Sequence, residues 1–168
     1  MKQRIMVYIN KLEAYKTAIK NLHWSSNNMS EHKLLDDIAS SLSDFQDELA
    51  ESAQGIYGKI KINELRPRKY TITNSKKMIN DLLSDTKMFL GSTKSKEMVG
   101  IKSIVEAFIG ELNQFSYLMD FCLKEDIKRK LANSGMIKEG KININENELR
   151  QVVRKAINNV IINNKTRL

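Results

Sequence analysis

Residues 30–57 read SEHKLLDDIASSLSDFQDELAESAQGIY, and their pattern is the starting point for the predicted architecture. Its apolar residues recur every three or four positions, which is the spacing of one stripe on an amphipathic helix. They are Leu34, Leu35, Ile38, Leu42, Phe45 and Leu49. Ser30 stands just before this stripe and is a favourable N-cap residue, so the pattern predicts a helix from Ser30 to about Tyr57.

Three more stretches show the same periodicity. Residues 4–24, 74–91 and 95–123 each carry one apolar stripe at helical spacing. Serines and asparagines at 25–28 favour a turn after the first stretch, and Gly91-Ser92-Thr93 separates the last two. Residues 58–73 contain Gly58 and Pro67 and fit an irregular connection. Two helices, a crossover and two more helices predict an all-α, ferritin-like four-helix bundle over residues 1–123 with one long connection.

A basic extension follows this predicted bundle, over residues 124–168. Residues 125–168 hold ten basic and five acidic residues, and Gly135 and Gly140 interrupt the first part. Asn145 and Glu148 resemble a capping box and predict a fifth, amphipathic helix over about 146–163. Three roles stay open for this C-terminal helix: packing on its own bundle, docking on another subunit or partner, or lying on DNA or a membrane surface.

The composition limits the classes of function. The chain has 168 residues, a net charge of +8 and one cysteine, Cys122, which excludes a disulfide framework and a cysteine-only metal site. The positive charge favours anionic partners and predicts non-specific, salt-sensitive DNA binding. No signal peptide is recognisable, and no apolar run approaches the roughly 20 residues of a membrane span. We therefore expect no membrane span and a cytoplasmic protein, or one packaged inside a particle.

The two histidines, His23 and His32, flank the predicted turn between the first two helices. Imidazole together with carboxylate suits iron, zinc or manganese. At about 100° per residue, Asp36, Asp47 and Glu51 fall within about 100° of His32 around the second helix. The apolar stripe lies on the other side, so these four residues are predicted to point away from the core of their own chain.

Distance along the helix decides how a site could form. His32 and Asp47 are separated by about 22 Å at a rise of 1.5 Å per residue, which no single metal site spans. In a two-fold dimer with antiparallel second helices, each end of one helix meets the opposite end of the other. His23, His32 and Asp36 of one subunit would then meet the carboxylates of Asp47 and Glu51 in the next. The spacing thus predicts two equivalent sites per dimer.

This pattern resembles the Dps family, the mini-ferritins that protect DNA in starved bacteria. The matching residues are His23-Trp24, His32, Asp36 and Asp47-Glu48-Leu49-Ala50-Glu51. The resemblance covers about residues 3–123. It implies a homo-oligomeric cage of twelve subunits in which peroxide or oxygen oxidises Fe(II) at inter-subunit sites and Fe(III) is stored. It also maps residues onto catalytic metal-ligand positions, namely His23, His32, Asp36, Asp47 and Glu51, and Trp24 onto the aromatic residue beside them.

Three departures from the family keep a second interpretation open. The two histidines stand nine residues apart instead of about a dozen, the lysine-rich tail of many family members is not evident at the N-terminus, and residues 124–168 are additional. The alternative is a non-enzymatic helical bundle, for example a structural or packaged protein of a phage, that keeps the fold without iron chemistry. Asp37, Asp44 and Glu48 are interpreted as a solvated acidic flank in both cases.

Overall fold

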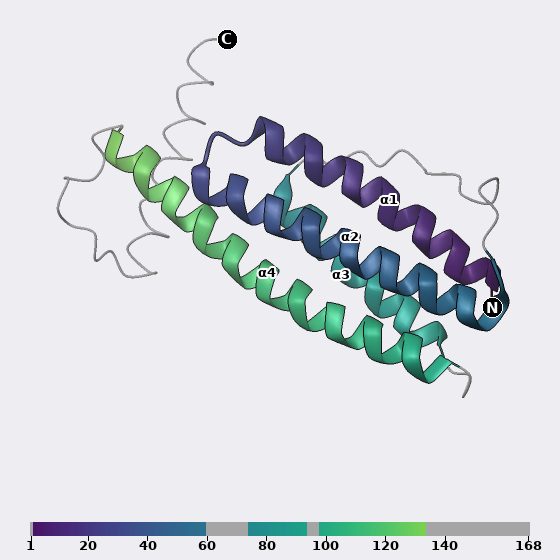
Figure 1. Ribbon diagram of the computed structural model, residues 1–168. Helices are drawn as coiled ribbons and strands as arrows, with labels where there is room; N and C mark the ends of the chain where they lie inside the picture. Colours follow the sequence, from purple (N-terminus) through teal and green to yellow (C-terminus); the bar gives the residue numbers. More distant parts are fainter. Residues whose placement is uncertain (1, 60–73, 94–97, 134–168) are drawn as a thin grey trace, which may run out of the picture. The chain divides into compact units, whose positions relative to one another are not determined.

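The computed structural model describes residues 2–59, 74–93 and 98–133. These residues form four helices and no strand, as Figure 1 shows. The helices are α1 (Lys2–Ser25), α2 (Met29–Tyr57), α3 (Ser75–Ser92) and α4 (Val99–Asn133). The all-α prediction is confirmed. The predicted irregular connection, apart from its first two residues, and the predicted helix at 146–163 lie outside the described residues.

Two predicted helix boundaries were wrong. Asn28, not Ser30, caps α2, because its side-chain oxygen accepts hydrogen bonds from the backbone N–H groups of Ser30 and Glu31. The fourth helix continues ten residues past the predicted end at 123. The residues beyond 123 were assigned to the basic extension, but Glu125 pairs with Lys128 and Asp126 with Lys130, and such i,i+3 and i,i+4 pairs support a solvated helix.

The chain divides into two compact units, residues 1–124 and 125–168, and the following description concerns the first unit. Contacts between its helices fix their directions. The Gln46 side chain of α2 donates to the Ile9 carbonyl of α1, and His23 lies beside His32, so α1 and α2 are antiparallel. At the start of α3, the Ser75 hydroxyl donates to Glu31 near the start of α2. Helices α2 and α3 therefore run in the same direction (Figure 1).

Helix α4 runs against α2 and α3. The Lys76 ammonium at the start of α3 lies 2.9 Å from the Asp120 carboxylate in the second half of α4. The Asn28 amide at the start of α2 donates to the Cys122 carbonyl. Helices α1 and α2 thus form one antiparallel pair, and α3 and α4 form another. The two middle helices, α2 and α3, run parallel to each other. Tyr57 and Ser75 consequently lie at opposite ends of the bundle.

Four aromatic rings, one from each helix, form the centre of the core. Tyr8 of α1 stacks on Phe89 of α3 at 4.2 Å, and Phe45 of α2 stacks on Phe108 of α4 at 3.9 Å. The two stacked pairs contact each other edge to face. The ring centroids of Tyr8 and Phe45 are 6.3 Å apart, and the planes of these rings are inclined at 70°. Apolar residues that the helical periodicity predicts to be internal continue this core along the bundle.

Because the Tyr8 phenol is buried, we predict that the free energy of unfolding falls at high pH. Burial is the main cause that raises the pKa of Tyr8 above its ordinary value of 10.0, and the nearby Asp85 carboxylate adds to it, against the opposing hydrogen bond with Thr86. The folded state keeps a proton that the unfolded chain loses above about pH 10, so the free energy of unfolding falls as pH rises beyond that value.

Tyr8→Phe is the matched control for this effect. The variant is expected to be less stable than wild type by about 1 kcal/mol at pH 9, because it lacks the hydrogen bond to Thr86. By pH 11 the wild type loses about 1.4 kcal/mol through Tyr8 and the variant does not, so the gap closes. Urea unfolding of both proteins at the two pH values measures the gap. A gap that stays constant would contradict the role of Tyr8.

Candidate metal centre

The two histidines are held together at the turn between α1 and α2. His23 is in the last turn of α1, and His32 is in the first turn of α2. Their rings stack with centroids 3.7 Å apart and an interplanar angle of 28°. The Nδ1 atom of His23 is 3.1 Å from the carbonyl oxygen of His32, and Nδ1 of His32 is 2.9 Å from the carbonyl oxygen of His23. We call this reciprocal pair the histidine clasp.

These hydrogen bonds determine which ring nitrogen is available to a metal. A carbonyl oxygen only accepts, so Nδ1 of each ring must carry the hydrogen and donate. In a neutral imidazole the lone pair then sits on Nε2. Metal-binding histidines usually have this arrangement, in which a backbone carbonyl fixes the tautomer and the ring orientation. In the neutral form, each ring of the clasp thus keeps its lone pair on Nε2, the nitrogen with which a histidine so held binds transition metals.

A buried network attaches the clasp to the rest of the bundle. Asn28, which is 7% exposed, caps α2 and also donates to the Cys122 carbonyl of α4. Glu31 accepts hydrogen bonds from the hydroxyl groups of Ser26 and Ser75. Burial, and then the Glu31 carboxylate, raises the pKa of the Cys122 thiol. The turn is therefore fixed by contacts to α3 and α4.

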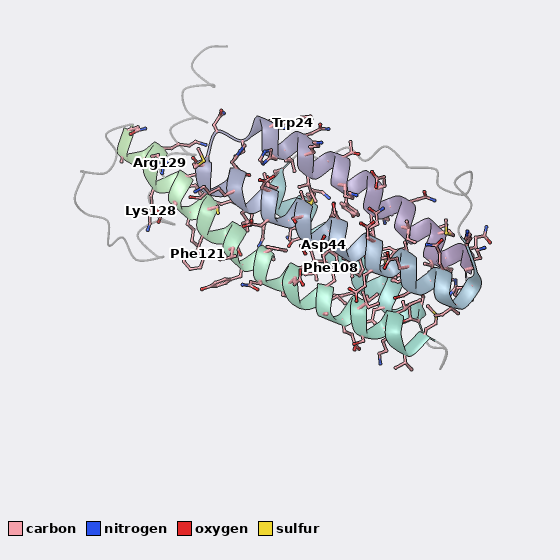
Figure 2. The ribbon with its side chains drawn as sticks, in the orientation of Figure 1. Trp24, Asp44, Phe108, Phe121, Lys128 and Arg129 are labelled. Carbon is pink, nitrogen blue, oxygen red and sulfur yellow. The ribbon has the colours of Figure 1, made fainter. Side chains whose placement is uncertain are left out.

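Asp36 and Trp24 lie beside the clasp. The Asp36 carboxylate is 3.8 Å from Nδ1 of His23, and its side chain is 74% exposed. Trp24 is 68% exposed and stands near the end of α1, as Figure 2 shows. Both residues line a groove of about 440 Å³ between α1 and α2, together with His23. The Lys20 ammonium, 5.3 Å from the centre of the Trp24 ring, supplies a cation in the same groove.

Asp47 and Glu51 lie on the same side of α2, several turns further along. Both side chains are exposed, and so is Asp36, while the apolar stripe of α2 is buried. The predicted orientation away from the core is therefore confirmed for the three carboxylates, whereas His32 is half-buried. Within one chain, the structure brings His23, His32 and Asp36 together but leaves Asp47 and Glu51 apart from them. Among the described residues, no group of three or more histidine, cysteine and acidic side chains could hold a metal ion by itself.

Sequence reasoning missed the features that hold this region in place. The reciprocal hydrogen bonds of the clasp depend on the backbone path through a short turn, which residue spacing does not define. Asn28 gave a usable signal, since an asparagine just before an apolar stripe is a strong N-cap candidate. Glu31 accepts hydrogen bonds from Ser26 and from Ser75, which is 44 positions further along the chain. Nothing in the local sequence pattern indicates these bonds.

Further findings bear on the identity of the chain. None of the helices in the described part of the chain has the length and apolar character needed to cross a membrane. No curated protein and no solved structure matches the chain. One family of proteins matches it over residues 23–119, which is more than half of its length. The matched range begins at His23 and contains every candidate ligand. The chain belongs to this family, the family of unknown function DUF5856.

Proposed function

We propose that this protein is a Dps-like ferroxidase that binds and oxidises Fe(II) at sites shared between two subunits. The observation that carries the proposal is the histidine clasp, whose Nδ1 hydrogen bonds leave Nε2 of each ring for a metal, near the start of a helix that also bears exposed carboxylates. Asp47 and Glu51 are too far along α2 to join the clasp of their own chain. An antiparallel contact between the α2 helices of two subunits would bring them to the clasp of the partner.

The donor set fits the proposed substrate. Two imidazoles and three carboxylates are suitable ligands for Fe(II), and the carboxylates also stabilise the higher charge of Fe(III). Peroxide would accept one electron from each of two Fe(II) ions and, with two protons, form two water molecules; oxygen would be a less efficient oxidant. Backbone carbonyls hold the two histidine rings in place, and Asp36, near His23, is a weaker or outer ligand.

The helix directions support the wider proposal of a ferritin-like cage. Parallel middle helices and antiparallel outer pairs are the arrangement expected for a bundle with one long crossover. In this proposal twelve subunits enclose the Fe(III) mineral in the cytoplasm, and the net charge of +8 per chain attracts DNA without sequence preference. Removal of Fe(II) and peroxide would then protect the bound DNA from oxidative damage.

One observation favours the second candidate, a helical bundle without iron chemistry. The clasp bonds each histidine to the chain itself and stacks the two rings at 3.7 Å. These contacts alone are sufficient to fasten the end of α1 to the start of α2. In that role the histidines would be structural residues, and the protein could be a component of a larger particle.

Iron oxidation separates the two candidates. The full-length protein is loaded with Fe(II) without oxygen, peroxide is added, and the absorbance of Fe(III) is followed with time. The ferroxidase proposal predicts oxidation faster than in a protein-free control, with the Fe(III) remaining in solution with the protein. A rate equal to the protein-free rate would refute the proposal and favour the structural role.

A further inference from the structure

The outer face of α2 is strongly acidic. Its exposed carboxylate residues are Asp36, Asp37, Asp44, Asp47, Glu48 and Glu51. The same stretch of the helix has one exposed cation, Lys33. Two lysines of α1, Lys16 and Lys20, line the groove between α1 and α2 beside this face. The Lys16 ammonium donates to Gln46 and lies 3.6 Å from the Glu13 carboxylate, and the Lys20 ammonium lies over the Trp24 ring. Because Lys16 already has Glu13 and Gln46 as partners, Lys20 is the lysine of this groove that can offset the negative charge of the α2 face.

This face has little apolar surface with which to bind another subunit. The large apolar residues that are exposed on α1 and α2 are few: Val7 lies near the start of α1, Trp24 and Met29 lie next to the clasp, and Ile56 lies at the far end of α2. Stable interfaces between identical subunits usually have a more apolar centre from which charged residues are depleted. A two-fold contact between two α2 helices would instead place acidic residues opposite acidic residues, and like charges in contact oppose association.

We propose that divalent metal ions gate the dimerisation of this protein, with the partner being a second copy of the chain. The inference rests on the proposed shared site. Without metal, the two α2 faces repel each other and the chains stay apart. A metal ion bound by the clasp of one chain and by Asp47 and Glu51 of the other neutralises the carboxylates and bridges the subunits. The binding energy of the metal thus becomes association energy.

Sedimentation velocity with zinc tests this inference without any redox reaction. The full-length protein is compared at several concentrations in EDTA and in free Zn²⁺. We expect chains that are mainly separate in EDTA and a dimerisation constant about tenfold tighter or more in zinc, because an ion that binds only the dimer stabilises it by mass action. Higher salt is expected to promote association in EDTA, because it screens the repulsion between the acidic faces.

Two double variants with the same charge change separate bridging from repulsion. Asp47→Asn with Glu51→Gln removes the proposed ligands, and this variant is expected to lose the response to zinc. Asp44→Asn with Glu48→Gln removes the same charge from neighbouring turns, so it is expected to associate more strongly in EDTA and to keep the response. Equal association of wild type in EDTA and zinc, or an unchanged zinc response without Asp47 and Glu51, would overturn the inference.

The result also distinguishes this inference from the proposed function. A dimer that forms without metal and oxidises Fe(II) would refute the gating and leave the ferroxidase proposal intact. Dimerisation by zinc without Fe(II) oxidation would do the opposite. In that case the clasp and the α2 carboxylates would form a metal-dependent assembly site.

Discussion

Replacing Asp47 and Glu51 together with alanine is expected to reduce Fe(II) oxidation by peroxide to the protein-free rate. The two residues are one helical turn apart on the exposed face of α2, so both can approach the same metal position. Changes to residues that only orient a ligand already cost about 10–100-fold in metal affinity or activity, and removing two ligands should cost more. The rate of Fe(III) formation measures the effect.

Asp44→Ala with Glu48→Ala is the matched control for this prediction. These residues have the same spacing and charge and are also exposed, but Asp44 and Glu48 line a groove between α2 and α4. Figure 2 labels Asp44 and Phe108 of α4, which lines the same groove. The control is expected to keep the oxidation rate of wild type within about twofold, because neither residue is a proposed ligand and exposed charges are screened by salt. Equal loss in both variants would show that general acidity, and not a specific site, promotes the reaction.

The second large effect concerns stability: Phe45→Ala is expected to lower the free energy of unfolding by about 3–5 kcal/mol. Phe45 is 4% exposed and stacks on Phe108 while its ring meets Tyr8. Removing it leaves a cavity where α1, α2 and α4 meet, and the remaining large rings cannot easily fill the space. Chemical denaturation followed by circular dichroism gives the value.

Phe121→Ala removes the same side chain from the surface of α4. Phe121 is 50% exposed and contacts Tyr117 edge-on at 4.9 Å. The expected loss is below about 1 kcal/mol, because the ring buries little area in the folded chain. A loss for Phe45→Ala as small as that for Phe121→Ala would mean that the four-ring centre contributes little to the stability of the bundle.

The fold was largely predictable because helical periodicity is strong in this chain. Leu34, Ile38 and Leu49 were placed inside from their spacing, and all three are buried. The predictions failed where local signals compete. Ser30 and Asn28 are both good caps, and the actual cap was decided by the bond from Asn28 to α4. The fourth helix was predicted to end at Leu123, before a polar and basic stretch, although the ion pairs of that stretch support a helix.

The candidate site was predictable only in part. The angular positions of Asp36, Asp47 and Glu51 follow from the period of α2, and their exposure agrees with them. The proximity of His23 to His32 could be expected from a short turn, but the stacking and the reciprocal bonds could not, since they depend on backbone geometry. The shorter spacing of nine residues is compatible with two rings in contact. Whether a partner supplies Asp47 and Glu51 remains a prediction.

Mixing two inactive variants tests the shared site most directly. His23→Asn with His32→Asn keeps a side-chain donor near each Nδ1 position and removes Nε2, while Asp47→Asn with Glu51→Gln removes the carboxylates. Each variant alone is expected to oxidise Fe(II) at the protein-free rate. After unfolding and joint refolding of equal amounts, half of the dimers are mixed and each has one complete site, so about a quarter of the wild-type activity should return. A mixture of folded proteins that stays inactive would contradict the shared site, and so would activity in either variant alone.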